Sequence, residues 1–182
     1  MQTHNFGATY QEGIVSQIDP KTHKVRCKIP ALEDLETAWL SFLTPNAGGN
    51  QFYCLPDIGE LVALLLDSKG EGGCVLGTIY NEQDPTPVQD ADIWMRKFSN
   101  GTVISHNRKT GDVVVNTQGH LTATAAGGAT INADTTINGK LHATGKITSS
   151  QEVSAPKVKQ GNIELGTHKH SGDSGGKTGL PE

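Results

Sequence analysis

Residues 121–147 read LTATAAGGATINADTTINGKLHATGKI, and the pattern of this stretch indicates how the second half of the chain is built. Aliphatic side chains recur with a period of two, Thr, Asn, Lys and His fill the places between them, and glycines interrupt the runs. Because successive side chains of a β-strand point to opposite faces, the pattern predicts a ladder of short strands, each with one narrow apolar face. The aliphatic positions of the ladder are Val113, Val115, Leu121, Ala123, Ala125, Ile131, Ile137, Leu141, Ala143 and Ile147.

One copy of the chain cannot bury this narrow face. From Ser99 to Glu182 there is no Phe, Tyr or Trp, and no helical period supplies a covering layer. Ordering a backbone costs about 1–2 kcal/mol per residue, which so little apolar surface does not offset. The segment is therefore disordered, a single-chain β-solenoid, or intertwined with other copies. Abundant Val, Ile and Thr favour intertwined β-structure, because disordered segments are usually poor in β-branched residues.

The first part of the chain predicts a small β-domain that contains every aromatic residue and every cysteine. Short apolar stretches alternate with turns that contain Gly or Pro, and no helical period is present. The run at 61–66 is apolar throughout, which predicts a strand buried on both faces. Five short strands in this arrangement favour a closed barrel of the oligonucleotide/oligosaccharide-binding (OB) type. The stretches are 12–29 (two strands joined by a turn), 37–43, 61–66 and 74–80.

Charge and composition exclude several classes of protein. The formal net charge is −4, which argues against a nucleic-acid binder. The first 98 residues hold 7 Lys/Arg and 13 Asp/Glu, a net charge of −6. No apolar run has the ~20 residues of a membrane span, and the first residues predict no secretion signal. Three cysteines without a CxxC pair predict reduced core residues.

His168 and His170 are two residues apart near the C-terminus, so in an extended chain both side chains point to the same side. Two imidazoles form a weak metal site, but three copies that meet on an axis would supply six nitrogens in octahedral geometry. Zinc prefers four ligands, so the site would favour iron. The alternative is two solvated histidines in a frayed tail.

No catalytic constellation is found in the sequence. Asp57 and Glu60 flank Gly59 in a Pro/Gly-containing segment and predict a turn instead of an acid/base pair. The remaining histidines lack a partner pattern and are expected in loops or on the surface. They are His4, His23, His106, His120 and His142.

Taken together, the chain resembles the phage tail baseplate assembly protein V, or central spike, family, which is related to the spikes of contractile tails and type VI secretion systems. The resemblance spans nearly the whole chain, in the order barrel, β-ladder and terminal His-x-His. Its motifs are Gly13-Ile14-Val15, Thr37-Ala38-Trp39-Leu40, Leu55-Pro56-Asp57-Ile58-Gly59-Glu60-Leu61-Val62, Gly73-Cys74-Val75-Leu76-Gly77-Thr78-Ile79-Tyr80 and Thr167-His168-Lys169-His170-Ser171-Gly172.

The resemblance implies an all-β homotrimer with an OB-fold-like barrel, a triple-stranded β-helix shaft and a pointed apex. In several members three His-x-His motifs hold one iron ion per trimer, which here implies His168 and His170 as ligands; further shaft ions such as calcium are compatible with it. Family members are virion proteins of the tail baseplate, assembled in the host cytoplasm. The barrel is expected to bind hub or tail-tube proteins, and the apex to pierce the host outer membrane when the sheath contracts.

The expected domains are a barrel at 1–80, a neck at 81–100, a shaft at 101–165 and a metal-binding apex at 166–182. Some spikes of this class carry a lysozyme domain between barrel and shaft, but here the intervening stretch is too short for one, so no enzyme is expected. The main alternative is a trimeric tail-fibre or adhesin fragment that binds cell-surface glycan. A metal-dependent hydrolase that uses His168 and His170 is the third hypothesis.

Overall fold

The computed structural model describes residues 7–172 and 174–179. Within them the regular structure consists of β-strands and one short 3-10 helix, η1 (Pro30–Leu32), so the all-β prediction is confirmed. No helix in this part of the chain is long and apolar enough to cross a membrane. The chain divides into two compact units, Met1–Ala123 and Thr124–Glu182.

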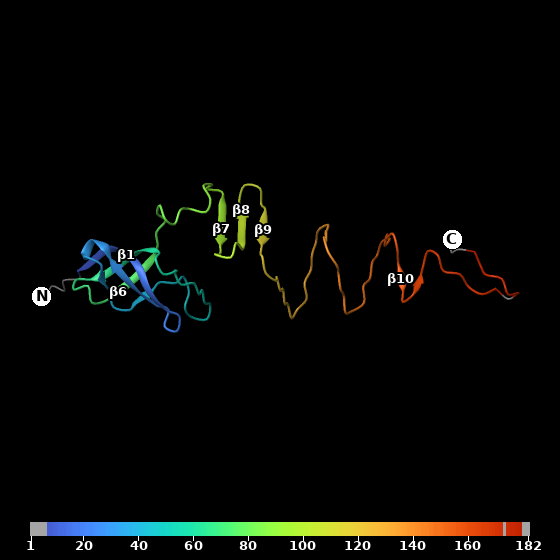
Figure 1. Ribbon diagram of the computed structural model, residues 1–182, viewed down its shortest axis with the longest axis horizontal. Helices are drawn as coiled ribbons and strands as arrows, with labels where there is room; N and C mark the ends of the chain where they lie inside the picture. Colours follow the sequence, from blue (N-terminus) through green and yellow to red (C-terminus); the bar gives the residue numbers. More distant parts are fainter. Residues whose placement is uncertain (1–6, 173, 180–182) are drawn as a thin grey trace. The chain divides into compact units, whose positions relative to one another are not determined.

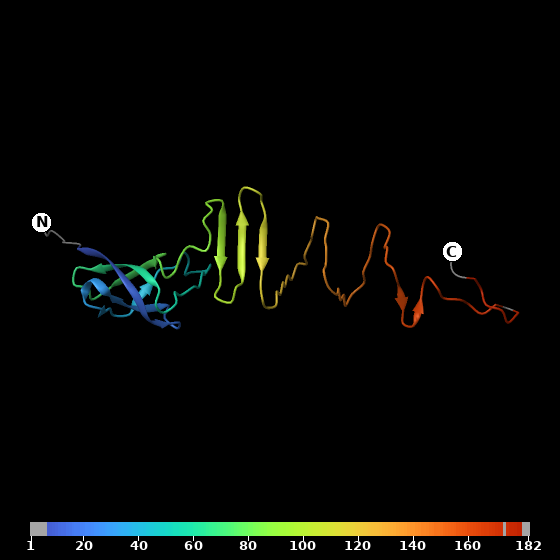
Figure 2. The same ribbon diagram turned by 45° about the horizontal axis from the view of Figure 1, so that its top comes forward.

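The first unit contains the predicted barrel (Figures 1 and 2). Neighbouring strands pair in the order β1-β5-β6-β4-β2, and β2 pairs back to β1, which closes five strands into a barrel. The short strand β3 pairs antiparallel with the end of β2. The strands are β1 (Ala8–Asp19), β2 (Lys24–Ile29), β3 (Leu35–Glu36), β4 (Leu40–Phe42), β5 (Leu61–Asp67) and β6 (Gly73–Thr78).

The long strand β1 makes the closure possible because it pairs with β5 along its first part and with β2 along its second. The register with β2 shifts between Val15 and Gln17, and such a bulge bends a strand. Gly13 lies where β1 passes closest to the core, since a Cβ there would stand 2.9 Å from Leu64 Cδ1. The buried core consists of Val15, Val25, Cys27, Ile29, Leu40, Val62, Leu64, Leu66 and Val75.

The prediction that the run at 61–66 is buried on both faces is wrong. In β5 burial alternates: Val62, Leu64 and Leu66 face the core, whereas Leu65 is 40% exposed. The barrel wall is a single layer, so the outer face of β5 meets solvent. There Leu65 pairs across the strands with Tyr10, which is also exposed.

This alternation predicts different costs for two neighbouring substitutions. Leu64→Ala should lower the unfolding free energy of the barrel by about 2–5 kcal/mol, because it leaves a cavity in the core. Leu65→Ala removes the same atoms from the outer face of β5 and should lower the unfolding free energy by much less than Leu64→Ala does. Urea denaturation followed by tryptophan fluorescence measures both; equal losses would contradict the observed orientation of β5.

The first unit also contains a separate antiparallel sheet of three strands, β7 (Ile93–Lys97), β8 (Val103–Asn107) and β9 (Val113–Asn116), which lie side by side in Figures 1 and 2. All three valines of β9 are exposed, although alternate residues point to opposite faces. Both faces of this sheet therefore present uncovered apolar side chains in the single chain.

The second unit has little hydrogen-bonded structure of its own. Among its described residues only β10 (Lys159–Gln160) and β11 (Ile163–Glu164) are strands, and they form a two-stranded hairpin. Residues 117–158, which precede β10 and begin at the end of the first unit, form a trace without strands (Figure 1). The predicted ladder positions there are exposed, with Ile131 at 72% and Ile137 at 54%. The predicted domain boundaries stay predictions.

Candidate functional site

The two histidines of the predicted tip lie close together. The ring centroids of His168 and His170 are 5.0 Å apart, with an angle of 79° between the ring planes. His168 is half-buried and His170 is exposed. Nδ1 of His168 lies 3.0 Å from the carbonyl oxygen of Leu165, so Nδ1 carries the proton and donates it. This bond fixes the ring and leaves Nε2 with its lone pair for a ligand.

The chain after His170 folds back on itself. The backbone N–H of Thr178 donates to the carbonyl oxygen of His170 at 3.0 Å, and the N–H of His170 donates to Oγ1 of Thr178 at 2.9 Å. Ser171 and Lys177 form a β-bridge within this loop. The backbone of His170 is thus tied locally, and its position does not depend on the preceding segment alone. The predicted apex residues 173 and 180–182 lie outside the described residues.

The residues present fit a shared metal site better than a site within one chain. Histidine ligands of metals usually donate the other ring nitrogen to a carbonyl or carboxylate, as His168 does. Among the described residues, however, no group of three or more His, Cys, Asp or Glu side chains is placed to hold a metal. One chain supplies two imidazoles, so a complete ligand set requires further copies.

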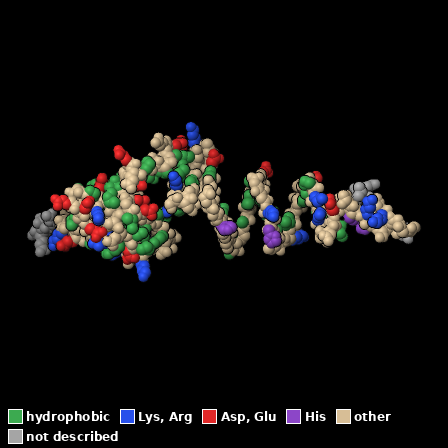
Figure 3. Space-filling view, viewed as in Figure 1, with side chains coloured by type: hydrophobic (Ala, Val, Ile, Leu, Met, Phe, Trp, Pro, Cys, Tyr) green, Lys and Arg blue, Asp and Glu red, His purple; other side chains and the backbone are tan. Residues whose placement is uncertain are grey.

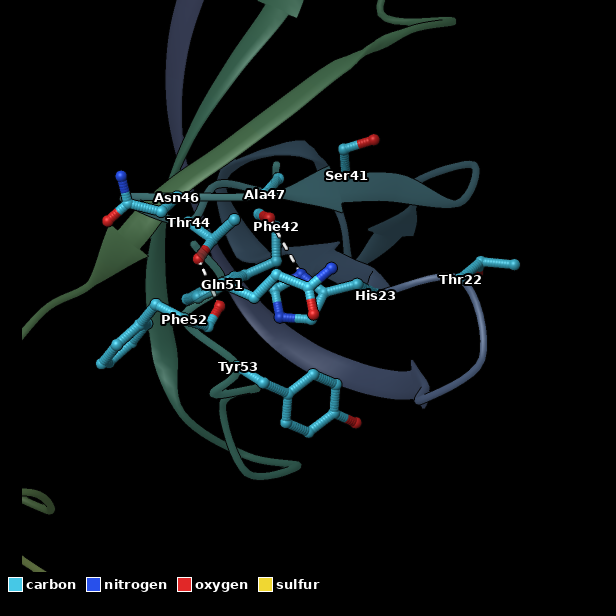
Figure 4. Close-up of a pocket in the computed structure, with 10 residues that line it drawn as sticks. All are labelled: Thr22, His23, Ser41, Phe42, Thr44, Asn46, Ala47, Gln51, Phe52 and Tyr53. Atoms are coloured by element: carbon cyan, nitrogen blue, oxygen red, sulfur yellow. Dashed lines mark hydrogen bonds between the residues drawn. The ribbon is translucent and has the colours of Figure 1, made fainter. Parts of the chain in front are cut away.

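His23 lies in a second candidate site that sequence reasoning missed. It was expected in a loop or on the surface; it does occupy the turn after β1, but its ring is half-buried against Phe42 and Tyr53 (Figure 4). Its Nδ1 donates to the carbonyl oxygen of Phe42, and its buried Nε2 has no partner among the described residues. No local sequence signal could reveal this, because Phe42 and Tyr53 are distant along the chain.

The pocket around His23 has a volume of about 360 Å³. Its loop wall is held by a hydrogen bond from Oγ1 of Thr44 to the carbonyl oxygen of Phe52, 2.6 Å long (Figure 4). Hydroxyl and amide side chains line the pocket, but no carboxylate does among the described residues, so the imidazole has no acidic partner there and no acid/base pair is formed. The lining residues are Thr22, His23, Ser41, Phe42, Thr44, Asn46, Ala47, Gln51, Phe52 and Tyr53.

The cysteines occupy three different environments. Cys27 is buried in the core as predicted, and burial raises the pKa of its thiol to about 11, which makes it a poor nucleophile. Cys54 and Cys74 are half-buried and lie outside the buried core, so the prediction of core residues is wrong for both. Cys54 accepts a hydrogen bond at 3.0 Å from Nη2 of Arg96.

Asp57 and Glu60 form the predicted turn. The N–H of Glu60 lies 3.3 Å from the carbonyl oxygen of Asp57, and Gly59 between them has a φ of 100°, which favours glycine. The N–H of Gly59 donates to the carbonyl oxygen of Val15, and the N–H of Val15 donates to the carbonyl oxygen of Glu60. The turn is thereby fixed to β1.

Comparisons with known proteins agree with this architecture. Residues 11–80 match the family described as the type VI secretion system/phage-baseplate injector OB domain. Over an alignment of 193 residues, the chain is 31% identical to the spike protein of Escherichia phage P2, and the alignment covers 93% of this chain and 90% of that protein.

Proposed function

The chain belongs to the phage baseplate V/spike family and is a spike protein of the phage tail baseplate, and on this premise we propose that three copies form a metal-tipped spike that pierces the host outer membrane. The family is structural and generally non-enzymatic. In the proposed spike, residues 101–165 of three copies intertwine into a triple-stranded β-helix. Sheath contraction drives the tip through the membrane.

The observation that carries this proposal is that residues 117–158 of a single chain form no strands and leave their aliphatic side chains exposed. Among the described residues, the backbone–backbone hydrogen bonds of this segment are only two, from Gly128 N–H to Ala125 O and from Leu165 N–H to Val158 O at its end. Backbone amides and carbonyls that become buried need partners. Two further copies would supply these partners and cover the aliphatic stripes, which a monomer cannot do.

The three-stranded sheet supports the same assembly. Trp94, Ile104 and Val115 belong to one face of it, by the register of β7, β8 and β9. Trp94 is exposed, as is Val115 at the edge strand. An edge strand of exposed valines invites pairing with another chain. We propose that the intertwined region begins with β8 and β9 of this sheet.

The proposed tip is supported by the closeness of the His168 and His170 rings. In the proposed trimer, three pairs of imidazoles converge and hold one iron ion, which supplies a cross-link between the three chains. The hydrogen bond to Leu165 O orients His168 for this role. The small, polar side chains of the second unit suit a narrow shaft, and the clamp prevents its ends from fraying under load.

The trimer has a direct test. Sedimentation equilibrium of the purified chain should give three times 19.3 kDa, with no concentration-dependent dissociation to monomer. Interwound chains cannot separate one strand at a time, so the trimer should also persist in detergent. A monomer with a random-coil second unit would contradict the proposal.

A further inference from the structure

A groove of about 340 Å³ crosses the outside of the barrel between the end of β4, the following loop and β6. Most of its lining residues are apolar, and several of these are exposed, including Leu43, Phe52 and Leu76. Hydrophobic side chains are visible on the surface of the barrel in Figure 3. A soluble domain seldom exposes such a set without a partner.

Glu60 is the one charged residue that lines this groove. Among the described ion pairs none involves Glu60. Burial raises the pKa of its carboxyl; a hydrogen bond from the backbone of Asp57 partly offsets this, and the carboxylates of Asp57 and Asp84 raise it further. Because the turn is fixed to β1, the backbone of Glu60 is held in place, and its carboxylate stays at the groove although burial disfavours its charge.

The chain already places one basic side chain at an end of this groove. The guanidinium carbon of Arg96 lies 5.4 Å from the ring centroid of Phe52, and its Nη2 contacts Cys54 Sγ. Phe52 and Cys54 both line the groove. The aromatic face of Phe52 therefore already holds a cation of the chain itself, which shows that this end of the groove accommodates a basic side chain and leaves Glu60 as the group for a further one.

We propose that this groove receives a Lys or Arg side chain of a neighbouring baseplate protein, whose aliphatic stem packs on Leu43, Leu76 and Pro56 while its charge pairs with Glu60. The inference rests on the proposed function, since it names the chemistry by which the barrel joins the baseplate. Long basic side chains commonly bury their stems on apolar surface. The net charge of −6 in the first 98 residues complements a basic partner.

The test uses full-length Glu60→Gln and Glu60→Lys, with Glu71→Gln and Glu71→Lys as matched controls. Glu71 is exposed in the turn between β5 and β6 and does not line the groove. Binding of each purified protein to phage tails assembled without this chain is measured at low salt. We expect Glu60→Gln to bind at least about tenfold more weakly and Glu60→Lys more weakly still, whereas both Glu71 variants bind as the wild type does.

Thermal unfolding separates docking from folding. Glu60→Gln removes a charge that burial and two carboxylates disfavour, so its melting temperature should equal or exceed that of the wild type while its binding falls. Suppressors of Glu60→Lys, selected for plaque formation, should replace a Lys or Arg of another baseplate protein by an acidic residue.

Unchanged tail binding by both Glu60 variants would overturn the proposal. A Glu60→Lys chain that loses its own oligomeric state in sedimentation would also overturn it, because the occupant would then be a second copy. A wild-type chain that does not join tails contradicts the proposed function itself, because that failure does not depend on residue 60.

Discussion

Ile137→Asp is expected to abolish the trimer, and Ile131→Asp should do the same. In the proposed shaft each substitution places three carboxylates around a dry axis, where like charges repel and water cannot solvate them. Removing a charge from water costs several kcal/mol per ion. The free-energy cost of burying three carboxylates therefore exceeds the net free energy that stabilises a typical folded protein. Sedimentation should show monomers or aggregates in place of the trimer.

The neighbouring residues provide matched controls. Asn132→Asp and Asn138→Asp add the same charge one position further along the chain, and the period of two places these side chains on the opposite face. Both controls should assemble as the wild type does. Normal assembly of Ile131→Asp and Ile137→Asp would place these aliphatics outside the axis and remove the main support for the intertwined shaft.

The second large effect is expected at the tip. The wild-type protein should contain about one iron per trimer in elemental analysis, and His168→Ala combined with His170→Ala should contain none. The variant should remain trimeric, because the shaft supplies most of the contact between chains. Its C-terminal end should become accessible to protease beyond Leu165, and its ability to penetrate membranes should fall.

Acidification and a control substitution complete this test. A metal-bound imidazole must be neutral, so acid should release the iron from the wild type and expose the same protease sites. Lys169 lies between the two proposed ligands, and in an extended chain its side chain points to the other side. The Lys169→Ala variant should therefore keep the metal. Metal content that is unchanged in the double alanine variant would leave the two histidines as solvated residues of the tail.

Local pattern determined much of the barrel. Turns at Asp19-Pro20 and at Gly59 lie where predicted, because proline and glycine restrict or permit particular backbone angles whatever the surroundings. The 5.0 Å between the ring centroids of His168 and His170 agrees with their spacing of two residues in the sequence. These features depend on a few adjacent residues, and the sequence is sufficient for them.

Contacts between distant residues were decided by the tertiary structure. The exposure of Leu65 in an apolar run depends on which face of β5 closes over the core, and hydrophobicity alone does not reveal that the barrel wall has a single layer. The contacts of the half-buried His23 ring with Phe42 and Tyr53, and of Arg96 with Cys54, join residues far apart in sequence. Burial is a property of the closed barrel, and the sequence predicts it only where alternation is strict. The groove at Glu60 is lined by residues of β4, of β6 and of the segment after β4, and only the tertiary structure brings these residues together.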